Sequence, residues 1–179
     1  MNKTSKRKVP FLQGSLDALC GVYCIVNVVN LIKPLSKPQS KVLFGEIVCQ
    51  VDQQAMQLQN CLLEGLSLKV MKKLLHATLS GYAIVWHIPY AGKRNPSLNA
   101  FWLSMQAFLE EGGRRCILLR LTGTNDHWTV VKSISQQQLN LYDSDNLQRI
   151  SRMHCSTEAT AADKAHMLWP AQCIFIRSN

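Results

Sequence analysis

Several common patterns are missing from this 179-residue sequence, and each absence argues against a class of protein. The longest nearly apolar run covers about 14 residues, too few for a helix that crosses the core of a bilayer. No period of about 20–50 residues repeats, which argues against solenoids and propellers. No Cys-x-x-Cys pair and no zinc-finger spacing of His and Cys occurs, so we expect neither a metal site nor another cofactor.

Acidic residues are also scarce. The chain has 11 Asp and Glu against 20 Lys and Arg, which gives a formal net charge of +9. Four of the positive charges are Lys3, Lys6, Arg7 and Lys8, and we expect residues 1–9 to form a basic flexible arm. The others are scattered and form no basic stripe interleaved with aromatic residues, so we expect no nucleic-acid partner. The net charge favours an acidic partner, or it simply keeps the protein in solution.

A classical export signal is a further absence. Gln13, Ser15 and Asp17 interrupt any apolar core after the basic residues, and Asn27 and Asn30 break the following run. We therefore expect no membrane partner. The protein is expected to be cytoplasmic, or delivered by a dedicated secretion system that needs no such signal.

The residues that are present describe a globular protein. With 47% hydrophobic and 17% charged residues, the chain is long enough to bury a substantial core, and we expect a single domain over residues 1–179. Its seven cysteines form an odd set, and most of them lie in apolar segments where a thiol packs as a small hydrophobe. Free thiols in a reducing compartment fit this pattern best.

Periodicity divides the chain into a mainly helical part followed by a mainly stranded part. We expect helices over residues 18–32, 40–59, 67–79 and 95–113, and strands over residues 81–90, 114–123, 126–135, 138–145, 147–152 and 171–178. Asp17 and Ser67 are the expected N-caps of the first and third helices, and the polar segment 154–166 is expected to be a loop or a short helix. This order predicts an α+β fold in which an antiparallel sheet packs on the first helix, with a cleft between the two parts.

Four residues could work together in such a cleft. Cys20 lies in the first turn of the expected helix over 18–32, where unpaired N–H groups and the helix dipole favour a thiolate. His127 begins a strand and could take the proton of a thiol across the cleft. Asp143 ends the next strand of the hairpin and could hold the imidazole in one orientation. Gln13 could donate its amide N–H to an oxyanion beside the thiol.

These stretches resemble a known family. A Gln-Gly pair at 13–14, a Cys-Gly pair at 20–21 that opens an apolar helix, a His-Trp pair at 127–128 on a strand, and Asp143 after the next strand are similar to the papain-like cysteine peptidases. The likeness is greatest to the bacterial double-glycine peptidases that trim the leader peptides of bacteriocins. There are two departures, because the interval from Gln to Cys is one residue longer and Ser144 follows the Asp where Pro is common.

The resemblance implies a cysteine peptidase and assigns a role to each of the four residues. Cys20 would be the nucleophile, His127 the proton carrier, Asp143 the residue that orients His127, and Gln13 an oxyanion donor. Cleavage after small residues, such as a Gly-Gly pair, would follow from a narrow cleft.

Three further residues are expected to contact the substrate, namely Gly21, Trp128 and Asp17. Trp128 could equally be a core aromatic residue.

A basic peptidase of this kind without membrane or ATPase segments also resembles toxin or effector domains that bacteria deliver into rivals or hosts. Its partners would then be a protein or peptide substrate and an inhibitory immunity protein.

Other assignments stay open at this stage. Cys24 lies one turn further into the same helix and is the alternative nucleophile, although its deeper position suits packing. Asp145 is the alternative to Asp143, whereas Asp126 fits a turn. His87 is the alternative base, but no acidic residue closes a hairpin after it.

Two other functions are compatible with the same residues. One is acyl transfer without peptide hydrolysis, as in transglutaminases, deamidases and amidases. The other is a non-catalytic module that binds proteins and has kept the fold.

Overall fold

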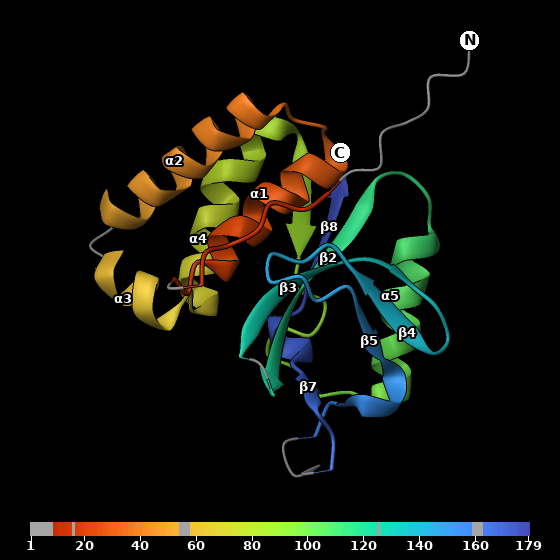
Figure 1. Cartoon of the computed structure of the whole chain (residues 1–179). Coiled ribbons are helices and arrows are strands. Elements are labelled where there is room, and N and C mark those ends of the chain that lie inside the picture. The colour runs from red at the N-terminus through yellow and green to blue at the C-terminus, as the bar shows by residue number, and fades with distance from the viewer. Residues whose placement is uncertain (1–8, 16, 54–57, 125, 159–162) are drawn as a thin grey trace.

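Helices cover both faces of one sheet in the computed structural model, which describes residues 9–15, 17–53, 58–124, 126–158 and 163–179 (Figure 1). The α-helices of these residues are α1 (Cys20–Ile32), α2 (Lys37–Gln53), α3 (Leu58–Glu64), α4 (Leu68–Leu79) and α5 (Leu98–Glu110). The strands are β1 (Ile84–His87), β2 (Arg115–Gly123), β3 (His127–Ile134), β4 (Gln138–Leu141), β5 (Arg149–Ser151), β6 (Cys155–Ser156), β7 (His166–Leu168) and β8 (Ile174–Ser178). Short 3₁₀ turns occur at Ser80–Tyr82, Arg152–His154 and Pro170–Gln172.

The strands form one sheet in the order β1-β8-β2-β3-β4-β5. Neighbouring strands along this path are antiparallel, and β7 adds a further antiparallel pairing to the end of β2. The short pairing of β6 with β7 is parallel. The chain is therefore a mixed α+β fold whose sheet is mainly antiparallel, as the sequence predicts.

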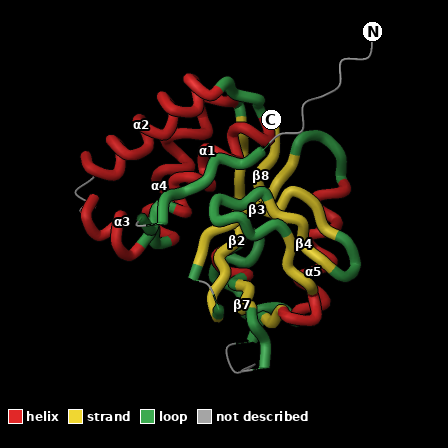
Figure 2. The backbone as a smooth tube through the Cα atoms, viewed as in Figure 1, coloured by secondary structure: helices red, strands yellow, loops and turns green. Residues whose placement is uncertain are grey.

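The sheet separates two hydrophobic cores. Successive side chains of a strand point to opposite faces, so β2 contributes Cys116 and Leu118 to the core under α1 and Ile117 and Leu119 to the core under α5. Figure 2 shows the helices α1, α2 and α4 on one side of the strands and α5 on the other. The expected packing of the sheet on the first helix is confirmed, and α5 covers the opposite face.

Local capping signals locate two helices correctly. The side chain of Ser67 accepts a hydrogen bond from Val70 N–H at the start of α4, as expected. The helix expected over 95–113 is α5, where Ser97 caps Ala100 N–H in the same way.

Two expectations are wrong. Asp17 is not the N-cap of the first helix, because α1 begins only at Cys20 and has Leu19 at its N-cap without a side-chain bond. The segment 154–166 is not only loop or helix, since its two ends contribute β6 and β7. Both strands are short: β7 pairs with β2 and with β6, and β6 pairs with β7, which no local periodicity indicates.

The segment before α1 runs back along that helix, and we call residues 9–15 the strap. Asn27 holds the strap at Phe11, whose N–H donates to Asn27 Oδ1 at 2.8 Å and whose carbonyl accepts from Asn27 Nδ2 at 3.1 Å. The hydroxyl of Tyr142 donates to the carbonyl of Val9 and accepts from Asn30 Nδ2. Burial of the two asparagines of the apolar helix is thus compensated by hydrogen bonds, which Asn27 makes to the strap itself and Asn30 makes to Tyr142 and to Leu35 N–H.

Of the basic arm expected over 1–9, only Val9 lies within the described residues. In the described part of the chain, no helix has the length and apolar character needed to cross a membrane.

Candidate active site

The structure brings Cys20, His127 and Asp143 together at the N-terminal end of α1. His127 Nε2 lies 2.8 Å from Asp143 Oδ2, and the ring also hydrogen-bonds to the thiol of Cys20. Because Nε2 faces Asp143, Nδ1 is the ring nitrogen left to meet Cys20. All three residues are at most 5% exposed, so their interactions are shielded from bulk water.

Elements from both parts of the chain position these side chains. Cys20 is the first residue of α1, where the N–H groups of the first turn have no helical acceptor. His127 is the first residue of β3, which packs against α1. Asp143 follows β4 by two residues, and its Oδ1 accepts from the backbone N–H of Asp145 at 2.7 Å and of Leu147 at 3.2 Å. These bonds fix the carboxylate so that Oδ2 remains for the imidazole.

His127 and Asp143 each shift the pKa of the other. Burial by itself lowers the pKa of His127, but the hydrogen bonds and charges of Asp143 and Cys20 outweigh it and raise the pKa to about 10. Burial likewise opposes ionisation of Asp143, yet the hydrogen bond and charge of His127 lower the pKa of that carboxyl below its usual value. An imidazolium beside a carboxylate is thus the stable form near neutral pH.

Gln13 reaches the same place at the end of the strap. Its backbone N–H donates to the carbonyl of Ser144 at 2.9 Å, which joins the strap to the loop that carries Asp143. The hydroxyl of Ser144 lies 3.5 Å from Gln13 Oε1 and donates to it. The NH₂ group of the amide is then the donor left for the cavity beside Cys20.

The end of α3 and the turn that follows it are hydrogen-bonded to the loop before Cys20 and to Trp128, the neighbour of His127. Ala18 N–H donates to the carbonyl of Leu62 at 2.8 Å, and the indole of Trp128 donates to the carbonyl of Leu66 at 2.8 Å. Gly65 lies between these two bonds with φ +80, and a Cβ there would come within 3.3 Å of the Ala18 carbonyl oxygen. Only glycine suits this backbone, so Gly65 lets the turn approach the loop that precedes Cys20.

A cavity of about 310 Å³ opens above the thiol and the imidazole. Residues of four segments line it: Gln13 to Cys20, the end of α3, the β2–β3 hairpin, and Asp145 after β4. It therefore lies between the helical part and the sheet, where the sequence predicts a cleft.

The three residues expected to contact the substrate have different surroundings. Asp17 lines the cavity, but its carboxylate also accepts from Gly14 N–H and Leu19 N–H within the loop. Trp128 is fully buried under the site and does not line the cavity. Gly21 does not line it either, and this expectation needs correction.

Gly21 serves the packing of α1 instead. A Cβ on this residue would lie 2.8 Å from Leu66 Cδ1 and 2.9 Å from Met71 Cε. Because Gly21 has no side chain, α1 can approach the α3–α4 turn. This face of α1 packs on Leu66 and Met71, which do not line the cavity.

The alternative residues make other contacts. The thiol of Cys24 is fully buried and donates to the carbonyl of Trp128 at 3.1 Å, and burial raises its pKa well above the usual value. His87 lies on β1 and packs edge-on against Phe108 and Phe175. Asp145 lines the cavity, but it is Asp143 that contacts His127.

All seven cysteines are free, as the composition predicts. Cys49 is exposed, whereas the other six are buried. Among the described residues, no three His, Cys, Asp or Glu side chains converge in a way that could hold a metal ion.

Sequence patterns did not point to three other residues of the cavity. Glu64 ends α3, Arg120 lies in β2, and Asp126, which was expected only to serve a turn, forms an ion pair with Arg120. Arg120 also lies over the Trp128 ring, with Cζ 5.5 Å from its centroid. In the sequence, only the position of Arg120 inside the otherwise apolar stretch 116–121 could have indicated that these residues belong to the site.

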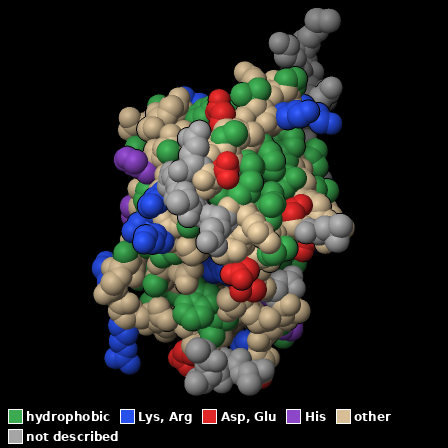
Figure 3. Space-filling view, turned by 90° about the vertical axis from the view of Figure 1, so that its left-hand side faces the viewer, with side chains coloured by type: hydrophobic (Ala, Val, Ile, Leu, Met, Phe, Trp, Pro, Cys, Tyr) green, Lys and Arg blue, Asp and Glu red, His purple; other side chains and the backbone are tan. Residues whose placement is uncertain are grey.

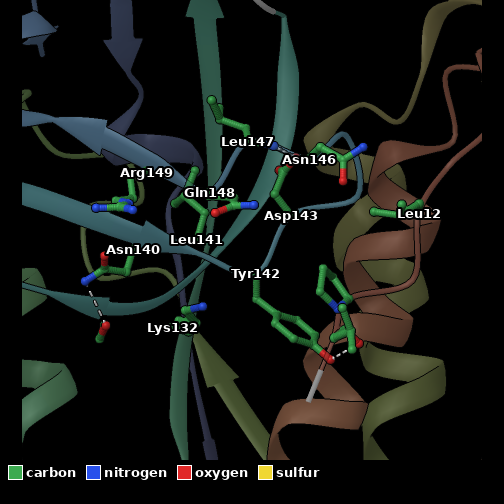
Figure 4. Close-up of a pocket in the computed structure, with 13 residues that line it drawn as sticks. Leu12, Lys132, Asn140, Leu141, Tyr142, Asp143, Asn146, Leu147, Gln148 and Arg149 are labelled. Atoms are coloured by element: carbon green, nitrogen blue, oxygen red, sulfur yellow. Dashed lines mark hydrogen bonds between the residues drawn. The ribbon is translucent and has the colours of Figure 1, made fainter. Parts of the chain in front are cut away.

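Asp143 also borders a second cavity of about 540 Å³, drawn in Figure 4. Tyr142 points from the sheet towards the strap in this view, and Lys132, Asn140 and Arg149 lie on the opposite side. None of the described residues that line it is a cysteine or a histidine. Of these two cavities, the smaller one is therefore the one that brings a thiol and an imidazole together.

The chain matches no known protein family, no curated protein and no solved structure.

Proposed function

We propose that this protein is a papain-like cysteine peptidase with Cys20 as its nucleophile. The observation that carries the proposal is the hydrogen-bonded series Cys20–His127–Asp143 at the start of a buried helix and at the floor of an open cavity. A helix that bears the thiol and faces a sheet that bears the imidazole and the carboxylate is also the arrangement of the papain-like fold.

The geometry supports a two-stage reaction. His127 holds the proton of the Cys20 thiol as an imidazolium, and the Cys20 thiolate attacks the carbonyl carbon of the scissile peptide bond. A C–S bond forms, and the oxyanion accepts hydrogen bonds from the Gln13 amide and the Cys20 backbone N–H. His127 then gives its proton to the leaving amine as the C–N bond breaks.

The second stage restores the enzyme. Water attacks the thioester, one of its protons goes to His127, and the acid product leaves as the C–S bond breaks, which restores the Cys20 thiolate beside the protonated His127. Asp143 keeps the imidazole oriented throughout, and its charge stabilises the imidazolium formed in both stages.

The cavity is small, and small residues are therefore the proposed choice on the acyl side of the scissile bond. A volume of about 310 Å³ leaves room for a glycine-rich strand beside Cys20 but not for several large side chains. A Gly-Gly sequence meets this requirement.

Thiol labelling is the first test. Under limiting iodoacetamide at neutral pH, we expect Cys20 to react faster than the exposed Cys49, as mass spectrometry of tryptic peptides would measure. Cys24→Ala is the matched control, because it removes a neighbouring thiol of the same helix and should leave the labelling of Cys20 intact. Labelling of Cys20 no faster than Cys49 would contradict the proposal and favour a module that only binds.

Substrate cleavage is the second test. New peptide N-termini should appear when a cell extract is treated with the native protein but not with the Cys20→Ala protein. A gain of about 1 Da in a substrate, or the attachment of an amine with release of ammonia, without new N-termini would point to deamidation or transfer instead. A role as a delivered toxin or effector, blocked by an immunity protein, extends this proposal and would be tested by expressing the native and Cys20→Ala forms in a susceptible cell.

A further inference from the structure

The candidate active site is acidic although the protein as a whole is basic. Four carboxylates line the cavity, those of Asp17, Glu64, Asp126 and Asp145. Arg120 is the one Lys or Arg among the described residues that line it, and it is paired with Asp126. The formal charge of the chain is +9, so this local excess of negative charge runs against the average.

Three of the carboxylates have no cationic partner among the ion pairs of the described residues, namely Asp17, Glu64 and Asp145. They come from three separate segments, which are the loop before α1, the end of α3 and the loop after β4. Folding therefore gathers them around the thiol from positions that are far apart in sequence.

The surface pattern agrees with this separation of charge. Figure 3 looks onto the helical side of the molecule, where many Lys and Arg side chains lie along one edge, another basic group lies at the upper right, and several Asp and Glu side chains lie between them. A charged ligand that approaches this face is attracted or repelled locally, since charges more than about 10 Å away are screened at moderate ionic strength.

We propose that the site accepts a cationic peptide, with Lys or Arg next to the small residue at the scissile bond. The inference rests on the proposed peptidase function and adds the class of substrate to it. A Lys or Arg side chain that leaves the floor of the cavity at Cys20 would meet Asp17, Glu64 or Asp145 at the rim. An acidic side chain in the same place would be repelled by all three.

This preference is the opposite of what the net charge favours. A basic protein attracts acidic partners at long range, whereas the cavity selects cationic groups at contact distance. The charge of the whole chain therefore does not predict the charge of its substrate.

Peptidyl chloromethyl ketones test the inference, because Cys20 Sγ displaces chloride from the reactive carbon and forms a stable C–S bond. Three probes that end in Lys-Gly, Gln-Gly or Glu-Gly differ only in charge beside the reacting glycine. At low ionic strength, we expect the lysine probe to alkylate Cys20 at least about tenfold faster than the glutamate probe. The exposed Cys49 serves as an internal reference and should show a much smaller ratio.

Substitutions locate the source of the preference. Glu64→Gln and Asp145→Asn keep the shape of each side chain and should each reduce the lysine-to-glutamate ratio about two- to threefold, and together more. Asp52→Asn is the matched control, because Asp52 is an exposed carboxylate on α2 that does not line the cavity. Raising the salt to about 1 M, where screening acts within about 3 Å, should shrink the ratio in the native protein.

Each outcome decides a separate point. Equal rates for the three probes at Cys20, or faster reaction of the glutamate probe, would overturn the cationic preference and leave the peptidase proposal standing. Reaction of Cys20 no faster than that of Cys49 with every probe would instead overturn the peptidase proposal itself. A ratio that falls as much in Asp52→Asn as in Glu64→Gln would show that the preference does not arise from the cavity.

Discussion

The two faces of the sheet are covered by helices of equal length, α1 and α5, each of 13 residues. α5 buries mainly large apolar side chains, such as Phe101, Trp102 and Met105. α1 buries aliphatic residues as well, but also polar ones such as Asn27 and Cys24, which hydrogen-bond to defined backbone atoms. Apolar contact is non-directional, whereas these bonds set one orientation. On α5 the indole of Trp102 donates to the Ser135 carbonyl at 2.7 Å, whereas the face that bears the thiol uses several such bonds.

Loss of the carboxylate should have the largest effect on the α1 side. In Asp143→Asn, the amide cannot supply the charge that stabilises the imidazolium, and we expect turnover to fall about a thousandfold or more. The rate of Cys20 alkylation and the turnover of a cleaved peptide would measure this. Asp145→Asn, tested with an uncharged substrate, is the comparison, and a larger loss there than in Asp143→Asn would contradict the assignment of Asp143.

A truncation on the α5 side should destabilise the fold without a direct effect on the site. Trp102 is fully buried, and Trp102→Ala should lower the free energy of unfolding by about 3–5 kcal/mol. Urea denaturation measures the loss. At temperatures where the variant stays folded, the alkylation rate of Cys20 should match that of the native protein, and a strong drop would mean that the two faces are coupled.

The charges of the His127–Asp143 pair predict how stability depends on pH. The pKa of His127 is raised in the folded state, so its contribution is complete below the unfolded value of about 6.5 and is lost as the pH rises through about 10. The pKa of Asp143 is lowered, so its contribution is present above the unfolded value of about 3.9 and is lost as the pH falls through the folded value.

The Cys20→Ala protein isolates this effect, because proton exchange between Cys20 and His127 is then absent. Its unfolding temperature should fall by roughly a few degrees from about pH 6.5 to 8, before other thiols titrate. In the double variant Cys20→Ala, His127→Gln, the fall should largely disappear. An equal fall in both proteins would assign the dependence to other groups.

A substitution at Asn27 tests the hydrogen bonds that attach the strap to α1. Asn27→Ala leaves the N–H and the carbonyl of Phe11 without their partners, and we expect a loss of about 1–3 kcal/mol in the free energy of unfolding. Turnover should fall too, because the strap carries Gln13 to the cavity. A loss of stability with unchanged turnover would show that Gln13 is held by Ser144 alone.

The smallest effect is expected at Cys24. Cys24→Ala removes a buried thiol that packs under Trp128 and should cost about 1 kcal/mol of stability. The turnover of the folded protein should not change. A loss of turnover as large as that of Cys20→Ala would make Cys24 the nucleophile.

The sequence allowed most elements to be located, because their signals are local. Ser67 and Ser97 stand where their helices begin, and β2 and β3 are clear runs of strand-forming residues. The order of Gln13, Cys20, His127 and Asp143 was also sufficient to name the four side chains that the fold brings together.

The remaining features depend on tertiary contacts. Asp17 has the residue type and position of an N-cap, but its carboxylate binds Gly14 N–H and Leu19 N–H, and α1 starts later. Gly21 looked like part of the site because it follows Cys20, yet the helix turns it towards Leu66. Glu64 reaches the cavity only because α3 packs against the loop before α1, and nothing in its local sequence indicates this.

The position of β8 has a consequence for the order in which the protein can assemble. This strand follows every other described element in the chain, yet it lies between β1 and β2 and places Ile174 and Ile176 under α1. During synthesis on the ribosome, Cys20, His127 and Asp143 therefore emerge before β8, the strand on which α1 packs. Until then β1 and β2 present unpaired edges, and a nascent chain carries all the reacting groups without the means to align them.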